Sequence, residues 1–264
     1  MGTVTFLSDY GLADDFVGVC HAVIAKISPE TRVIDLTHGV PRHDVRTGAL
    51  TLSRALPYTP AGVCFAIVDP EVGAERRAVA IRCREEDRIL VGPDNGLLIP
   101  AADVFGGALE AIDIGRSPHR LEPLAATFHG RDIFAPVAGH LAAGASFAGA
   151  GDPIDVGELT PLHLPEPVVG ENRIEAHALA IDGFGNVQLD VSHAQLAGSG
   201  LKMGRAVRVS GEPALFARTF ADVGTGELLL YEDAYRTLAL AVNRGSAAER
   251  LGLSPDDAVV LEPA

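Results

Sequence analysis

Apolar residues in the first half of the chain follow two alternating patterns. Runs typical of buried or half-buried strands recur at residues 3–9, 32–37, 62–69, 78–83 and 88–93. Helical spacing occupies residues 16–27, behind Asp14 and Asp15 as possible caps, and again residues 44–56. This alternation predicts βαβ units, and therefore an N-terminal α/β domain with a largely parallel sheet.

The pattern changes after residue 151. Residues 152–168 contain four prolines and little periodicity, which is typical of a linker. Short apolar strands then follow one another closely, beginning around the Gly turn of "IDGFGNV". We therefore expect an α/β domain over residues 1–151, a linker over 152–169 and a smaller, barrel-like β domain over 170–264.

Charge and composition exclude several classes of function. The chain carries 35 acidic against 21 basic residues, which argues against nucleic-acid binding and is compatible with a cationic small substrate. No apolar run approaches the roughly 20 residues that span a bilayer, and the first residues lack the basic region of a signal peptide. Cys20, Cys64 and Cys83 lie in apolar runs without metal-type spacing, as in a reducing compartment. These features predict a cytoplasmic protein with no membrane partner.

Polar segments punctuated by glycine follow three of the predicted strands: "SDYGLADD", "DPEVGAERR" and "GPDNG". The carboxyl ends of parallel strands meet at one edge of a sheet, where α/β folds bind ligands. The segment "TFHGRD" precedes an apolar helix expected over residues 133–143, so His129 can join the same edge. We therefore expect a cleft at this edge.

Each of these motifs also has an ordinary structural interpretation. "GPDNG" and "DGFGN" are strong turn signals, and Asp9 can simply end a strand. His21 and His140 fall on predicted helices, where histidines commonly have a surface or core role. Only the combination of motifs is specific.

That combination resembles a known family. Six segments occur in the order found in the S-adenosylmethionine hydroxide adenosyltransferases, relatives of fluorinase and chlorinase. They are "SDYGLADDFVG", "VDPEVGAERRAVAI", "VGPDNGLL", "TFHGRDIFAPVAGHLAAG", "IDGFGNV" and "TFADVG". The resemblance runs from about residue 3 to about residue 250, through both expected domains. It implies that water displaces methionine from the 5′ carbon of S-adenosylmethionine, giving adenosine and L-methionine, with no cofactor and no metal.

The resemblance implies a catalytic trio of Asp69, Arg76 and His129. Water is a weak nucleophile that must lose a proton, so the reaction needs groups that orient it and stabilise hydroxide. Arg76 supplies fixed positive charge, His129 accepts or relays the proton, and Asp69 orients His129 or pairs with Arg76. The identity of the formal base stays open at this point.

Substrate contacts follow from the same resemblance. Asp9 matches the residue that holds the ribose hydroxyls, while Asp14 and Asp182 match positions near the methionine end. Asn186 matches an adenine-edge contact, and Phe220 matches a ring stacked on adenine with Phe184 nearby. For both phenylalanines ordinary packing is the alternative.

The chain departs from the family at one place. Asp233, Ala234 and Tyr235 stand where relatives carry a serine-rich pair that helps to hold the methionine carboxylate, so Tyr235 and Arg236 are the candidates to replace it. The family further implies a homotrimer, in which one subunit's N-terminal domain and a neighbour's C-terminal domain share each active site.

Parts of the sequence are compatible with three other functions. A halogenase is disfavoured because Asp69 and His129 stand where fluorinase and chlorinase have tyrosines, and Gly130 stands where fluorinase has a serine. A metal-dependent hydrolase would use the acidic loops, but Arg76 and Arg131 would crowd positive charge into the same rim. Its ligands would come from Asp9, Asp14, Asp69, Asp94 and His129. A sensor that binds adenosine or S-adenosylmethionine without turnover is the third, against which an intact Asp–Arg–His set favours an enzyme.

Overall fold

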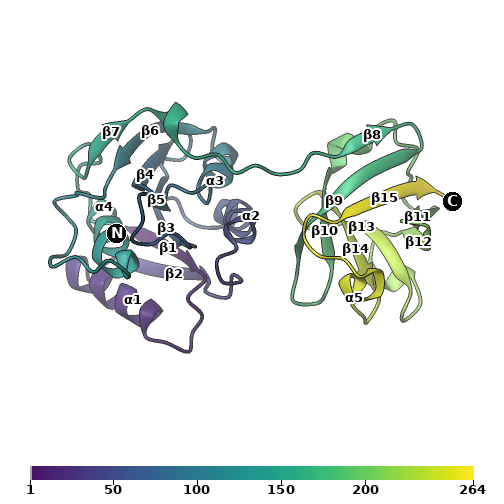
Figure 1. The fold of residues 1–264 in the computed structure, drawn as a ribbon, viewed down its shortest axis with the longest axis horizontal. Helices are drawn as coiled ribbons and strands as arrows, with labels where there is room; N and C mark the ends of the chain where they lie inside the picture. The colour runs from purple at the N-terminus through teal and green to yellow at the C-terminus, as the bar shows by residue number, and fades with distance from the viewer. Residues whose placement is uncertain (1) are drawn as a thin grey trace. The chain divides into compact units, whose positions relative to one another are not determined.

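A computed structural model describes residues 2–264 of the chain. The described residues divide into two compact units, the first ending at His163 and the second spanning Leu164–Ala264 (Figure 1). Each unit has its own hydrophobic core.

A mixed sheet organises the N-terminal unit, with strand order β2-β1-β3-β5-β4-β6-β7. Its strands are β1 (Thr3–Ser8), β2 (Arg32–Thr37), β3 (Val63–Ile67), β4 (Ala78–Cys83), β5 (Ile89–Pro93), β6 (Ala108–Asp113) and β7 (Asp152–Ile154). Strands β2, β1, β3 and β5 run parallel, whereas β4 is antiparallel to both of its neighbours. The connection from β4 to β5 is a short hairpin, which is too short for the crossover that parallel strands need.

Helices cover both faces of this sheet (Figure 1). On one face, α1 (Phe16–Ile27) packs beside α4 (Ala135–Ala142), and on the other α2 (Val45–Ala55) packs beside α3 (Ile99–Val104). Strand β3 is buried throughout, as its continuous apolar run predicts. The three cysteines are buried and free, in agreement with the sequence.

Two aspartates stand at helix starts. Asp44 caps α2 by accepting a hydrogen bond from the Thr47 backbone N–H at 2.9 Å. Asp15 occupies the corresponding position of α1, but its side chain makes no capping hydrogen bond.

The C-terminal unit is a closed barrel. Its strands are β8 (Val168–Gly170), β9 (Arg173–Ile181), β10 (Val187–Ser192), β11 (Ala206–Val209), β12 (Glu212–Phe216), β13 (Leu228–Glu232), β14 (Thr237–Val242) and β15 (Ala258–Pro263). Strand β10 pairs with both β14 and β9, which closes a ring of seven strands, and β8 adds to β9 outside the ring. The short helix α5 (Ala247–Leu251) ends at Gly252, which has a positive φ of 64°. The predicted fold class, an α/β domain followed by a smaller β-barrel domain, is confirmed.

The segment expected to be a linker, residues 152–169, contains ordered structure. Strand β7 extends the N-terminal sheet, a single 3-10 turn spans Val156–Glu158, and β8 pairs with β9. Both strands have three residues, which is too short for an apolar period to appear in the sequence.

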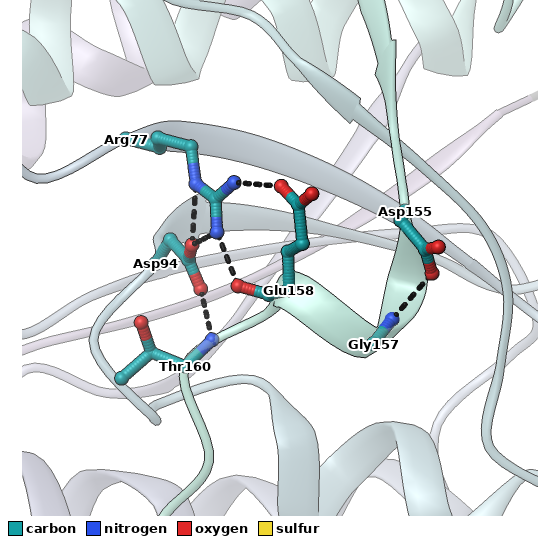
Figure 2. Close-up of polar contacts among 6 residues, drawn as sticks. All are labelled: Arg77, Asp94, Asp155, Gly157, Glu158 and Thr160. Atoms are coloured by element: carbon teal, nitrogen blue, oxygen red, sulfur yellow. Dashed lines mark hydrogen bonds and ion pairs between the residues drawn. The ribbon is translucent and has the colours of Figure 1, made fainter.

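A polar network fixes this segment to the N-terminal unit. Figure 2 shows that the carboxylate oxygens of Asp94 divide between the Arg77 guanidinium, at 2.8–2.9 Å, and the backbone N–H of Thr160, at 2.8 Å. Arg77 also donates to the carboxylate and the backbone carbonyl of Glu158. Asp94, in the "GPDNG" motif, is therefore an anchor for the chain that leaves the domain.

Within residues 2–264, no helix has the length and apolar character to cross a membrane.

Candidate active site

Asp69, Arg76 and His129 meet at the carboxyl end of β3. The Nε of Arg76 donates to both carboxylate oxygens of Asp69, at 3.0 and 3.1 Å, and its Nη2 forms a further, shorter contact with Oδ2. The same Nη2 lies 2.9 Å from Nδ1 of His129. The side chains of Asp69 and Arg76 are only 5% and 4% exposed, so this ion pair is buried. The sequence-predicted trio is thus brought together by contacts within one unit.

Different elements position the three side chains. Asp69 follows β3 by two residues, and the amide of Asn95 holds the strand's continuation by donating to the Val68 carbonyl at 2.9 Å. Arg76 lies just before β4, with its guanidinium 5.2 Å from the centre of the Phe134 ring. His129 precedes a π-helical turn, Gly130–Phe134, that leads into α4.

The contact with Arg76 sets the protonation of His129. A guanidinium has no lone pair to offer, so Nδ1 of His129 must accept this hydrogen bond and the ring proton lies on Nε2. Burial lowers the pKa of His129, and the positive charge of Arg76 lowers it further, partly opposed by Asp69 and Asp132. A neutral imidazole results, and its Nε2–H is the donor that faces away from Arg76.

The next two residues of the motif have a structural role. Arg131 binds the carboxylate of Asp132 through Nε and Nη2, at 2.6 and 2.9 Å, while its guanidinium lies over the Phe128 ring. Asp132 is buried and also accepts from the Ala125 backbone N–H at 2.8 Å. In "HGRD", therefore, His129 serves the site and Arg131 and Asp132 hold the loop in shape.

Tyr10 is a member of the site that the sequence did not single out. Burial raises the pKa of its hydroxyl well above the ordinary value, with Asp69 and Asp9 among the charges that add to the effect and Arg76 opposing it. A Cβ atom at Gly130 would lie 2.1 Å from the Tyr10 hydroxyl, so the glycine makes room for this ring. Its place directly after Asp9 in the first polar loop was the available signal.

The two N-terminal substrate candidates differ in their surroundings. Asp9 extends β1 and accepts a hydrogen bond from the His43 backbone N–H through Oδ2, at 2.9 Å. Asp14 is exposed in the loop before α1.

The C-terminal candidates gather in the second unit. Asp182 organises the turn between β9 and β10, accepting from the backbone N–H groups of Phe184 and Asn186 and from the Asn186 side chain at 2.8–3.0 Å. Phe184 is 82% exposed and Phe220 43% exposed, which core packing does not explain. The Phe220 ring lies 5.2 Å from that of Tyr231, whose pKa is raised to about 12 by burial and by Asp182 and Asp233. Tyr231 is a second neighbour that sequence reasoning missed.

Asp233 closes the turn between β13 and β14. It accepts from the backbone N–H groups of Tyr235 and Thr237 and from the Thr237 hydroxyl, at 2.8–3.0 Å. Arg236, one candidate for the methionine carboxylate, pairs with Glu232 at 2.9 Å, and Tyr235 is 47% exposed.

The ligand set of the metal-dependent hydrolase does not assemble. Among the described residues, the His, Cys, Asp and Glu side chains that gather closely enough to hold a metal ion are His21, Asp35 and His38, and none belongs to that set. Asp69 and Asp94 form ion pairs with Arg76 and Arg77 instead.

An open cleft of about 640 Å³ borders Arg76. It is also lined by Glu71, Glu75, Arg77, Asp94 and Asn95.

Comparison with known proteins gives a consistent result. The family model of the SAM hydroxide adenosyltransferase N-terminal domain matches residues 4–151, and that of the C-terminal domain matches residues 176–260. Over 254 residues the chain is 47% identical to (R)-S-adenosyl-L-methionine hydrolase from Salinispora tropica, covering 96% of this chain and 95% of that protein. A fluorinase from Nocardia brasiliensis is more distant, 28% identical over 278 residues, with 93% and 91% covered.

A solved structure shares the fold. The crystal structure of an uncharacterized conserved protein from Thermotoga maritima superimposes with a TM-score of 0.89 at 34% identity, covering 98% of this chain and 99% of that one. The resemblance drawn from the motifs is therefore confirmed.

Proposed function

The chain belongs to the SAM hydroxide adenosyltransferase family, and from this premise we propose that it hydrolyses S-adenosyl-L-methionine to adenosine and L-methionine. The oxygen of water forms a bond to the 5′ carbon, and the carbon–sulfur bond breaks with its electron pair staying on sulfur. Methionine leaves as a neutral thioether, so the positive charge of the sulfonium is replaced by the proton that water releases. The relative from Salinispora is named for the R epimer at sulfur, and we propose the same epimer as substrate here.

The contact between Arg76 and His129 carries this proposal. The buried guanidinium favours hydroxide over water, because its charge is screened little at this depth. The Nε2–H of His129 donates to the water oxygen and fixes its direction of attack. Since Nδ1 of His129 is bound to Arg76, the carboxylate of Asp69 is the acceptor that we propose for the proton, through lone pairs that Arg76 leaves open.

Residues of both domains bind the substrate in this proposal. Asp9 holds the ribose hydroxyls with a carboxylate that is positioned by the hydrogen bond from the His43 N–H to Oδ2. Asp14 and Asp182 face the cationic methionine end, Asn186 binds the adenine edge, and Phe220 stacks on the base with Phe184 nearby.

The proposed assembly is a homotrimer in which a neighbour's C-terminal domain completes each active site. This arrangement supplies the exposed aromatic rings of Phe184 and Phe220 with a partner. We place the protein in the cytoplasm, where its three free, buried cysteines stay reduced.

The surroundings of Gly130 argue against the halogenase alternative. A serine at this position would put its Cβ 2.1 Å from the Tyr10 hydroxyl, so the halide-binding side chain of fluorinase does not fit beside Tyr10. The nearby carboxylate of Asp69 would also repel a halide.

The test supplies each sulfur epimer of S-adenosylmethionine separately to the purified protein in EDTA, with and without chloride or fluoride. Chromatography follows adenosine, methionine and any halogenated nucleoside, and His140→Gln, on α4 outside the trio, serves as control for His129→Ala. We expect adenosine and methionine from the R epimer, independent of halide, at a rate about 10²–10³-fold lower in His129→Ala and unchanged in His140→Gln. A halogenated nucleoside, or binding without turnover, would contradict the proposal.

A further inference from the structure

We infer that His21, Asp35 and His38 form a binding site for one Zn²⁺ ion at the edge of the N-terminal sheet. The Oδ1 of Asp35 lies 2.8 Å from Nε2 of His21 and 3.1 Å from Nε2 of His38. The ligand atoms of the three side chains all lie within 4.8 Å of one another. None of the three is among the residues proposed for the hydrolysis.

Well-ordered elements hold these side chains in place. His21 is on α1, Asp35 is on the edge strand β2, and His38 directly follows that strand. Asp35 pairs in register with Phe6 of β1, and the Phe6 ring contacts both imidazoles, with centroids 6.0 and 4.5 Å away. Phe6 therefore forms the apolar floor on which the two histidines converge.

His38 provides the observation that points to an ion. Its side chain is 4% exposed, and its Nδ1 lies 2.8 Å from the Ser8 hydroxyl. Its Nε2 is buried and makes no hydrogen bond to any residue within 2–264, although an oxygen of Asp35 lies 3.1 Å away. When Nδ1–H donates to the Ser8 hydroxyl, Nε2 carries a lone pair that faces a lone pair of the Asp35 carboxylate. The two lone pairs repel each other unless a cation lies between them and is coordinated by both.

The donor set fits zinc better than magnesium or calcium. Two imidazole nitrogens and one carboxylate oxygen are the three-ligand set of many zinc sites, with water in the fourth position. Mg²⁺ and Ca²⁺ prefer oxygen ligands alone. Ligand atoms of a tetrahedral zinc site are about 3.3 Å apart, so the observed separations of 2.8 and 3.1 Å need only a small expansion. His21 and Asp35 are 34% and 42% exposed, which leaves a path for the ion and its water.

Binding of Zn²⁺ here would stabilise the folded chain without taking part in the hydrolysis of S-adenosylmethionine. The backbone carbonyl of His38 accepts from the Gly11 N–H at 2.7 Å, so the ion would fasten β2 to the loop that follows Asp9. The alternative explanation is that Asp35 is a charge on an exposed edge strand that protects the edge from pairing and forms ion pairs with the two histidines. That explanation predicts no stoichiometric metal binding.

The test titrates Zn²⁺ into the metal-free full-length chain by calorimetry, and records the visible spectrum after loading with Co²⁺. Variants are His21→Gln, Asp35→Asn and Ser8→Ala. The control is His193→Gln in the other unit, where one histidine contacts Glu232, a residue that also pairs with Arg236. We expect one ion per chain, a higher Tm with Zn²⁺, and the Co²⁺ bands of a low-coordinate site. Affinity should fall about 10–100-fold in Ser8→Ala and at least as much in His21→Gln and Asp35→Asn, with no change in His193→Gln.

Three results would overturn the site: no saturable binding, binding that survives in both His21→Gln and Asp35→Asn, or an equal loss in the His193 control. His21 is half-buried at the surface, so His21→Gln is expected to fold, and far-UV circular dichroism verifies that it does. Because every readout is binding, spectrum or Tm, the result is independent of whether the protein hydrolyses S-adenosylmethionine.

Discussion

At the scale of single residues, the proposed chemistry depends on the hydrogen bond from Arg76 to Nδ1 of His129. It makes the histidine a donor toward water and leaves the proton to the carboxylate of Asp69. It also makes His129 resist protonation, since His129⁺ would lose this contact and would lie beside a guanidinium. This contact thus sets the direction of proton transfer and, together with the burial of the ring, the pH at which the site works.

The first prediction follows for Arg76→Gln. Removing the charge should raise the pKa of His129, because burial still lowers it but the positive charge of Arg76 no longer does, while Asp69 and Asp132 continue to raise it. The same change should lower kcat about 10²–10³-fold. In the wild type, the acid limb of kcat/KM should lie below the ordinary histidine value of about 6.5. In the variant it should move to higher pH. NMR titration of the His129 ring measures the shift.

His140 is the internal control in the same spectra. Burial and His119 lower its pKa, and Arg76 is not among the causes, so its titration should not move. Protonation of His129 also affects the free energy of unfolding. Because the pKa of His129 is lower in the folded chain than in the unfolded chain, the folded chain binds fewer protons there, and the contribution of His129 to stability is lost as pH falls through its folded-state pKa. An unmoved or lowered midpoint of His129 in Arg76→Gln would contradict the assignment.

The second prediction concerns the contact between Gly130 and Tyr10. Gly130→Ala places a Cβ 2.1 Å from the Tyr10 hydroxyl, so one of the two must move. We expect the free energy of unfolding to fall by about 1–3 kcal/mol, with loss of turnover because His129 is the adjacent residue. Removing the hydroxyl in Tyr10→Phe leaves 3.2 Å to the ring carbon, so the double variant should recover part of the stability. Additive losses in denaturant unfolding would show that the contact is unimportant.

At the scale of elements, the segment that leaves the N-terminal unit is held by Asp94. Its side chain is 4% exposed and binds both Arg77 and the Thr160 backbone (Figure 2). The third prediction is that Asp94→Ala lowers the free energy of unfolding by about 1.5–3 kcal/mol, since it removes charge-assisted hydrogen bonds to the Thr160 N–H and to Arg77, which keeps its contacts with Glu158. Hydrogen exchange at Thr160 should become faster.

Glu158→Gln is the matched control for that prediction. Glu158 binds the same Arg77, but its side chain is 66% exposed, so the loss should stay below about 1 kcal/mol. Equal effects of Asp94→Ala and Glu158→Gln would refute the anchoring role of Asp94.

Elements with a long apolar period were predictable from the sequence, and short or context-dependent ones were not. Helix α1 and strand β2 appear where periodicity places them, at Phe16–Ile27 and Arg32–Thr37. Strands β7 and β8 have three residues each and depend on the neighbours that they pair with. The π-helical turn Gly130–Phe134 carries no sequence signal that distinguishes it from the helix that follows.

The same limit applies to the site. Asp69, Arg76 and His129 could be predicted because they stand in motifs with a recognisable order. Tyr10 could not, because its role depends on the space left by Gly130, 120 positions away. The cluster of His21, Asp35 and His38 is likewise created by the packing of α1 against the sheet, and its spacing matches no metal motif.

At the scale of the whole molecule, the candidate residues are divided between two units: Asp9, Asp14, Asp69, Arg76 and His129 in the first, and Asp182, Phe184, Asn186 and Phe220 in the second. The proposed trimer resolves this division by pairing each N-terminal unit with a neighbour's C-terminal unit. In a closed ring of three subunits, this heterologous interface forms at all three subunit contacts, and no N-terminal or C-terminal unit is left without a partner. It follows that defects in different units of different chains should complement each other.

The fourth prediction uses this complementation. His129→Ala inactivates the N-terminal contribution, and Asn186→Ala/Phe220→Ala weakens the C-terminal one, so each variant alone should be nearly inactive. A site is intact when its N-terminal unit comes from the second variant and its C-terminal unit from the first. Every mixed trimer contains one such site among its three, which restores about a third of the wild-type rate. Coexpression with two different tags isolates the mixed oligomers for assay. If each site were built within one chain, no mixed oligomer would contain an intact site, and the rate would stay at the level of the parents.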